Sequence, residues 1–213
     1  MLLQKTKKKR LDRKPGSVSN DANEIIVLDL LGPEKATIKG LDKPILDMLR
    51  AEAPMTHRKE GENLNLKNEK PVASGTLKPG NGWQEVKFDA PVKARFFCFE
   101  ALRSQNGNDN AAIAEFYLLG ENGKPLSRQH WQIAYADSEE TRGGNFTADK
   151  IFDLQESTYW STARGDKYPH QVVIDLREEV VVSGFQYLPR AEEGYPGMVK
   201  EYKAYTKMSP FKF

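Results

Sequence analysis

Residues 152–190 read FDLQESTYWSTARGDKYPHQVVIDLREEVVVSGFQYLPR, and this stretch decides the fold class. Two apolar runs, Gln171–Leu176 and Val180–Leu188, are rich in Val, Ile and aromatic residues, as β-strands are. The charged residues 177–179 between them predict a short exposed turn, and Ser157–Ser161 predicts a further strand. Strands alternating with loops and turns in this way indicate an antiparallel β-sandwich whose loops gather at its ends.

Strand signals continue on both sides of this stretch. The segment 94–102 is apolar on both of its alternating faces, which predicts a central strand, and residues 89–92 ahead of it predict a turn. The remaining predicted strands are Pro71–Leu77, Trp83–Phe88, Ala111–Leu119, Trp131–Tyr135 and Lys200–Lys207. The sequence therefore predicts an all-β domain over residues 71–213.

Four segments of the opening stretch resemble the factor V/VIII type C (discoidin) family, which overlaps carbohydrate-binding module family 32. They are Phe152-Asp153, Ser157–Trp160, Val173–Leu176 and Ser183–Arg190. In that family a strand like Trp131–Tyr135 comes first and one like Ala114–Gly120 comes last, whereas here residues 71–120 precede residues 125–213. The resemblance therefore implies a circularly permuted galactose-binding-like jelly roll. Two incomplete domains of about 50 and 90 residues are the alternative, but neither would bury a good core alone.

The first 70 residues carry different signals. Residues 1–14 hold seven Lys or Arg and one Asp, so the rest of the chain has a net charge of −4 although the whole chain has +2. Without an apolar period, residues 1–22 are expected to form a disordered basic tail, and nucleic-acid binding through it is the less favoured alternative. Three segments, Asn23–Asp29, Gly32-Pro33 and Gly40–Asp47, resemble the end of the last jelly-roll domain of glycoside hydrolase family 35 β-galactosidases. Residues 23–70 are thus interpreted as a remnant of that domain plus a linker.

The chain carries few signals of catalysis. It has one cysteine, Cys98, which is expected to be a buried apolar residue, and three isolated histidines, His57, His130 and His170. No Gly-x-Ser-x-Gly motif occurs, and the acid and nucleophile of family 35 lie in a barrel domain that these residues do not resemble. No catalytic residue is therefore predicted, although a chain that still hydrolyses galactosides is kept as a rival.

A calcium site is implied by the discoidin resemblance. The loop 153–158 resembles a family calcium loop, with Leu154 in place of the usual Gly and Gln155 in place of the usual Asp. The lost negative charge is expected to weaken binding, and a loop held only by hydrogen bonds is the alternative. The ligands carried over by position are Phe152, Gln155, Thr158, Ala114 and Glu115.

A sugar site is predicted in the loops, because saccharide recognition combines aromatic faces with polar groups for the hydroxyls. His170 is equally interpretable as a satisfied loop histidine and Arg190 as a clamp on a carboxylate, while Trp160 is assigned to the core. The predicted sugar-binding residues are Arg164, Tyr168, His170, Arg190, Tyr195 and Asn108, with Glu192 and Asn106 as further candidates.

These signals together predict the non-catalytic, carbohydrate-binding C-terminal portion of a β-galactosidase-like enzyme, directed to galactose-containing glycans. The alternative is a structural sandwich that packs on a catalytic domain without binding sugar itself. The expected partner is a glycan, with no nucleic acid and no membrane insertion, since no run approaches 18 apolar residues. A monomer is expected. No signal peptide is visible, and the parent enzyme is expected to be periplasmic or extracellular.

Overall fold

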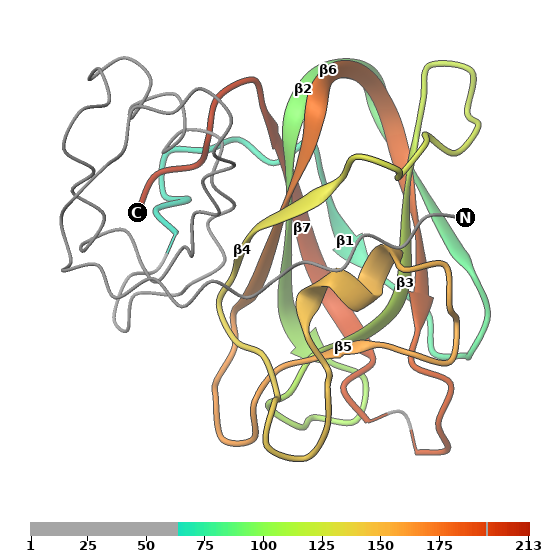
Figure 1. Ribbon diagram of the computed structural model, residues 1–213, viewed down its shortest axis with the longest axis vertical. Helices are drawn as coiled ribbons and strands as arrows, with labels where there is room; N and C mark the ends of the chain where they lie inside the picture. The colour runs from blue at the N-terminus through green and yellow to red at the C-terminus, as the bar shows by residue number, and fades with distance from the viewer. Residues whose placement is uncertain (1–63, 195) are drawn as a thin grey trace, which may run out of the picture. The chain divides into compact units, whose positions relative to one another are not determined.

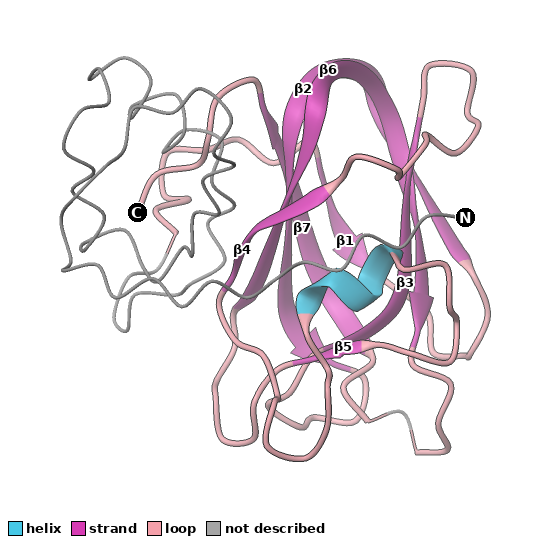
Figure 2. Cartoon of the chain, in the orientation of Figure 1, coloured by secondary structure: helices cyan, strands magenta, loops and turns pink. Residues whose placement is uncertain are grey.

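The computed structural model describes residues 64–194 and 196–213, which belong to one compact unit spanning Ala53–Phe213 (Figure 1). The predictions for residues 1–63 lie outside the described residues. The strands are β1 (Ala73–Thr76), β2 (Gln84–Ser104), β3 (Ala112–Leu119), β4 (Gln132–Ala136), β5 (Trp160–Ser161), β6 (His170–Pro189) and β7 (Val199–Lys207). Every pair of neighbouring strands is antiparallel, so the predicted all-β antiparallel sandwich is confirmed (Figure 2).

Two long strands, β2 with 21 residues and β6 with 20, bend over the top of Figure 1 and run through both layers of the sandwich. The strand order is β1-β7-β2-β6-β3-β5, with β4 paired to β6. In the first layer, the second half of β2 lies between β7 and the first half of β6, so the segment 94–102 is central as predicted. In the second layer, the first half of β2 pairs with the second half of β6, which also pairs with β3.

The strands predicted to be joined by the permuted order are neighbours in space. Ala73 of β1 lies opposite Ala204 of β7, and Thr76 lies opposite Glu201. Residues 71–120 and 131–213 therefore form one sandwich, which is the arrangement that the permuted reading requires.

The main core lies between the two layers. Phe97, Phe99 and Ala101 point into it from β2, while Phe96 and Cys98 point to the outer face of the first layer, as strand alternation requires. Trp160 has no exposed surface and donates its Nε1–H to the carbonyl of Ser138 at 2.9 Å, so its assignment to the core is confirmed. The outer cluster is covered by two segments of the same chain, at Leu64 and Phe211.

Three sequence predictions of local structure were wrong. The predicted turns at residues 177–179 and 89–92 are parts of the continuous strands β6 and β2. At the first, Arg177 takes a left-handed φ of 63° and donates its backbone N–H to Asp175 Oδ1 at 2.8 Å, so the chain bends without leaving the sheet. At the second, the register with β6 shifts between Lys87 and Val92, which is how a bulge absorbs extra residues. The predicted strand at residues 157–161 is reduced to β5, preceded by the unpredicted 3₁₀ helix η1 (Ala148–Phe152).

No helix among the described residues is long and apolar enough to cross a bilayer.

Candidate functional site

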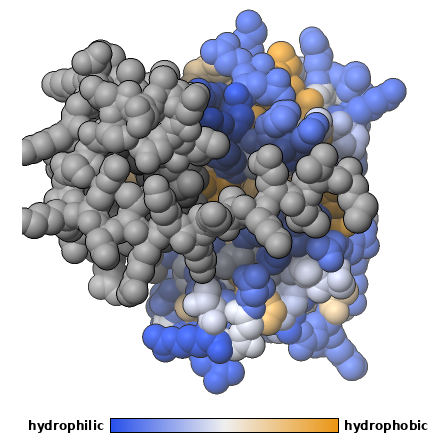
Figure 3. Space-filling model, in the orientation of Figure 1, coloured by the Kyte–Doolittle hydropathy of each residue, from blue (hydrophilic) through white to orange (hydrophobic). Residues whose placement is uncertain are grey.

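Four loops gather at one end of the sandwich, and we call this the loop face. They comprise residues 105–111, 137–147, 162–169 and 190–198, and they lie below β5 in Figure 1. Hydrogen bonds tie them to one another: Asn106 Nδ2 donates to the carbonyl of Gly194 at 3.3 Å, and the Ala112 N–H donates to the carbonyl of Gly197 at 2.7 Å. In Figure 3 the described surface at this lower end is mostly hydrophilic, with a few small apolar spots.

His170 anchors the loop face from below. Its ring is fully buried, with Nδ1 2.8 Å from Asp137 Oδ2 and Nε2 2.7 Å from the carbonyl of Asp109. Asp137 also accepts the Gln171 N–H through its other oxygen at 2.7 Å. The two ring nitrogens therefore contact one oxygen from each of two loops. His170 thus holds the loop 105–111 against the loop 137–147 and has no surface left for a ligand.

Tyr168 plays a similar part. Its hydroxyl donates to the carbonyl of Asn110 at 2.7 Å, and its ring lies 4.7 Å from that of His170. Burial, reinforced by the negative charges of Asp109 and Asp137, raises the pKa of Tyr168 well above its ordinary value. The residue therefore stays neutral and acts as a hydrogen-bond donor.

Arg164 lies on an exposed part of the loop face, and its backbone is fixed by Glu140. The Glu140 carboxylate accepts backbone N–H groups from Arg142 at 2.6 Å, Gly143 at 3.1 Å and Arg164 at 3.4 Å. These bonds stabilise the charged form and lower the pKa of Glu140. The bond from the Arg164 N–H holds the backbone of this residue in place, while its side chain is exposed.

Arg190 belongs to a layered stack at the edge of the loop face. Its guanidinium lies 4.2 Å from the centre of the Tyr159 ring and forms an ion pair with Glu192. Tyr159 in turn stacks on Phe146, with ring centres 4.7 Å apart and planes 15° from parallel. Arg190 is thus paired with a carboxylate, as the structural interpretation of this residue expects. Its side chain is also half exposed, so the pairing is compatible with the prediction that Arg190 contacts a sugar.

A cavity of about 580 Å³ opens beside the loop 162–169. Its floor holds a buried polar network, in which Glu100 accepts hydrogen bonds from Gln171 Nε2 at 2.8 Å and from the Tyr205 hydroxyl at 3.0 Å. The cavity is also lined by acidic, apolar and basic residues, namely Asp137, Asp166, Tyr168, Pro169, Leu64, Leu66, Lys67, Lys167 and Lys203.

The predicted sugar-binding residues thus fall into separate groups. Asn108, Arg164 and Arg190 lie on the loop face with exposed or half-exposed side chains. Tyr168 and His170 lie beneath it and hold the loops in place. Tyr195 lies outside the described residues.

Two of the predicted calcium-binding residues, Glu115 and Gln155, lie close together. The charge of Asp153 and the backbone amide of Gln155 both act on the Glu115 carboxylate, which places the loop 153–158 beside β3. The loop is closed by Asp153, which accepts the Gln155 N–H at 3.0 Å and the Thr158 hydroxyl at 2.8 Å. Leu154 stands in the left-handed region with φ 68°, the conformation that the Gly usual at this place adopts without strain.

Glu115 has a cationic partner that the sequence interpretation missed. Arg128 Nη1 is paired with Glu115 Oε2 and also donates to the carbonyl of Phe116 at 3.2 Å. The side chains of Glu115 and Arg128 are only 2% and 4% exposed. Glu115 Oε1 and the Nε and Nη2 atoms of Arg128 make no hydrogen bond within the described structure. Desolvation raises the pKa of Glu115, although the Arg128 guanidinium opposes that rise.

Comparison with known proteins supports part of the predicted resemblance. Residues 134–211 match the family model of the F5/8 type C domain. A sialidase of Micromonospora viridifaciens is 34% identical over 112 residues, which are 51% of this chain and 16% of the sialidase. The chain therefore spans about one sixth of the length of that relative, and the likeness concerns a module rather than the whole protein.

Proposed function

We propose that residues 71–213 form a non-catalytic glycan-binding module whose ligand lies across the loop face. The observation that carries the proposal is that some of the predicted residues are exposed on the loop face, whereas others are buried or half-buried and hold its loops in place. Asn108 and Arg164 are exposed and Arg190 is half exposed. His170 and Tyr168 are hydrogen-bonded to the backbone of the loop 105–111 and hold it in place. A rigid scaffold that presents polar side chains from joined loops is the usual design of a recognition site.

Support for a saccharide ligand comes from two sources. The F5/8 type C domain model matches the half of the sandwich that supplies three of the four loops. The similar sialidase acts, by its name, on a glycan substrate. We extend this to terminal galactose as the preferred sugar and to a family 35 β-galactosidase-like enzyme, exported from the cytoplasm, as the parent protein.

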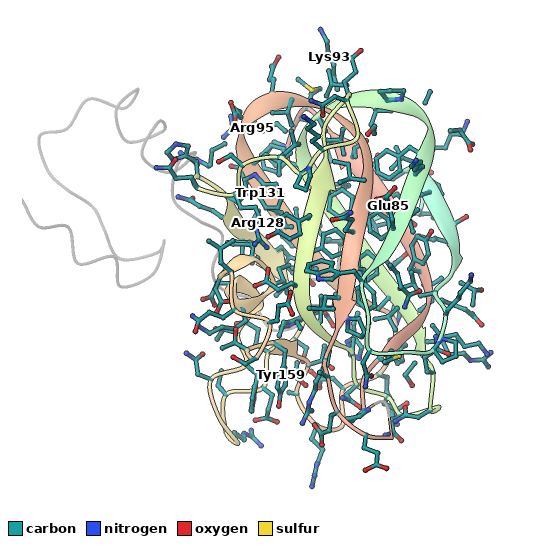
Figure 4. All side chains as sticks on the ribbon, turned by 90° about the vertical axis from the view of Figure 1, so that its right-hand side faces the viewer. Glu85, Lys93, Arg95, Arg128, Trp131 and Tyr159 are labelled. Carbon is teal, nitrogen blue, oxygen red and sulfur yellow. The ribbon has the colours of Figure 1, made fainter. Side chains whose placement is uncertain are left out.

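A glycan array with the full chain tests this function. We expect binding to galactose-terminated glycans, and Arg164→Ala and Asn108→Ala to reduce it without changing the melting temperature. Lys93→Ala is the matched control, because Lys93 is exposed at the end of the sandwich away from Tyr159 (Figure 4). Equal binding by all three variants would remove the loop face as the site. Turnover of a nitrophenyl galactoside would instead favour the enzymatic rival.

Calcium binding beside Glu115 is a second, separate proposal. The buried Glu115 Oε1 has no hydrogen-bond partner among the described residues, so one carboxylate oxygen fits a cation. No group of three or more His, Cys, Asp or Glu side chains in residues 64–194 and 196–213 is placed to hold a metal. The remaining ligands would be loop oxygens of Phe152, Gln155, Thr158 and Ala114, as calcium commonly accepts.

The Arg128 guanidinium already compensates part of the Glu115 charge, so the proposed calcium affinity is weak. EDTA is expected to lower the melting temperature of the wild type, since a ligand of the folded state stabilises it by mass action. The same treatment should leave Glu115→Ala unchanged. A wild-type melt that is insensitive to both EDTA and added calcium would exclude the ion.

A further inference from the structure

The outer face of the second layer carries an aromatic surface that lies apart from the loop face. Across three neighbouring strands, Glu85 of β2 lies opposite Gln186 of β6, which lies opposite Tyr117 of β3. Trp83 directly precedes β2 and, two residues before Glu85, falls on the same side of the strand. Glu85, which belongs to this surface, is labelled in Figure 4. We call Trp83, Glu85, Tyr117, Glu156 and Gln186 the Trp83 face.

Trp83 is exposed yet held in one orientation. Its residue surface is 39% exposed, whereas Trp131 and Trp160 are 7% and 0% exposed. Its Nε1–H donates to Glu156 Oε1 at 3.2 Å, across 73 residues of sequence. Its ring packs against that of Tyr117, with centres 5.3 Å apart and planes at 44°. The chain thus fixes a large aromatic ring at the surface, where full burial would have been more favourable for stability alone.

Polar groups surround the ring. Glu156 is exposed, and Gln186 Nε2 donates to Glu85 Oε2 at 2.9 Å. Beneath Tyr117, the Arg128 guanidinium lies 3.7 Å from the ring centre, with Nε and Nη2 making no hydrogen bond in the described structure. An aromatic face with carboxylate and amide groups at its edge matches a molecule that has one apolar C–H face and several hydroxyls.

We propose that the Trp83 face is a second saccharide-binding surface, on which a pyranose ring lies against Trp83 and its hydroxyls bond to Glu156 and Gln186. This inference takes its ligand class from the proposed function but uses none of the residues of the loop face. Two contact surfaces on one module bind a long glycan with greater avidity than either alone, provided the glycan spans both.

Two probes test the proposal with the full chain: lactose, which reaches one surface at a time, and a soluble β-linked galactan. Titration calorimetry of Trp83→Ala should show galactan affinity lowered about tenfold, the loss expected for removal of one stacking contact worth about 1.4 kcal/mol. Trp83→Phe should restore part of it. Met208→Ala is the matched control, because Met208 is another exposed apolar residue at 42% exposure.

Tryptophan fluorescence provides an independent readout, because Trp83 is the exposed one of the three tryptophans. Galactan should shift the emission of the wild type and of Arg164→Ala alike, and Tyr117→Ala should weaken that shift. If Trp83→Ala binds galactan as the wild type does while Arg164→Ala does not, the Trp83 face is overturned and the loop face stands. If Trp83→Ala alone loses binding, the Trp83 face stands and the loop face fails. Binding of neither probe by the wild type would overturn both.

Discussion

Replacing Arg128 with Met should destabilise the sandwich strongly, because it strands the carboxylate of Glu115. Met keeps most of the apolar volume but removes the cation, and Glu115 is 2% exposed in its side chain. Removing one partner of a buried ion pair costs about 3–5 kcal/mol. At roughly 2–4 °C per kcal/mol for a domain of this size, the melting temperature should fall by roughly 6–20 °C.

The matched control for this prediction is Arg103→Met. Arg103 on β2 forms an ion pair with Glu201 at 3.3 Å, but these side chains are 63% and 40% exposed. An exposed pair of this kind contributes about 0–1 kcal/mol. The double variant Arg128→Met/Glu115→Gln should recover much of the lost stability, because no buried charge remains.

Urea unfolding at pH 7 and pH 5 measures how much each substitution, Arg128→Met and Arg103→Met, lowers the free energy of unfolding. Burial already raises the pKa of Glu115, and loss of the Arg128 guanidinium removes the main opposing effect, so the carboxylate of the Arg128→Met variant should take up a proton more readily at pH 5 than at pH 7. The cost of the substitution should therefore be smaller at pH 5 than at pH 7. If Arg128→Met costs no more than Arg103→Met at either pH, the pair does not stabilise the fold as argued.

Three further outcomes are expected. Gly184→Ala should be strongly destabilising in urea unfolding, because a Cβ there would lie 2.3 Å from the Val86 carbonyl oxygen, whereas Gly143→Ala meets nothing within 4 Å and should be nearly neutral. Because the pKa of Glu115 is raised in the folded state, the contribution of Glu115 to stability is largest below the ordinary pKa of 4.5 and falls as pH rises through the folded-state pKa. Thermal melts of the wild type from pH 4 to 8 should show this fall in stability. The Glu115→Gln variant should not show it. Glu140→Ala should speed amide hydrogen exchange at residues 142, 143 and 164, and unchanged exchange there would show that the loop 137–147 is held by other contacts.

Strand content was predictable where the residues alternate or are apolar on both faces, as in the segment 94–102. The course of the chain at residues 177–179 was not predictable. Three charged residues after an apolar run occur both in turns that reverse the chain and in strands that only bend. What decides between them is Asp175, whose carboxylate accepts the Arg177 N–H and lets the strand continue. Such a bond depends on a side-chain orientation that periodicity does not encode.

The Glu115 partner shows a similar limit. A carboxylate on a strand as apolar as β3 has to be compensated, and this much follows from the sequence alone. Arg128 is 13 residues away, beyond the turn after β3, and nothing in its spacing marks it as the partner. For His170, too, the sequence left open whether it binds a ligand or supports the loop, because its burial depends on Asp137, 33 residues earlier.

The permuted strand order leaves the loop face intact. β7 begins at Val199, directly after the loop 190–198, and runs away from the loop face. Because Ala73 lies opposite Ala204 near the other end of β7, the break in the family order falls away from the four loops. The hydrogen bonds that join those loops, such as that from Asn106 to Gly194, therefore connect the two permuted halves without crossing the break. Opening the sandwich at that end changes which strand comes first in the chain but leaves every loop of the face continuous with the two elements that flank it.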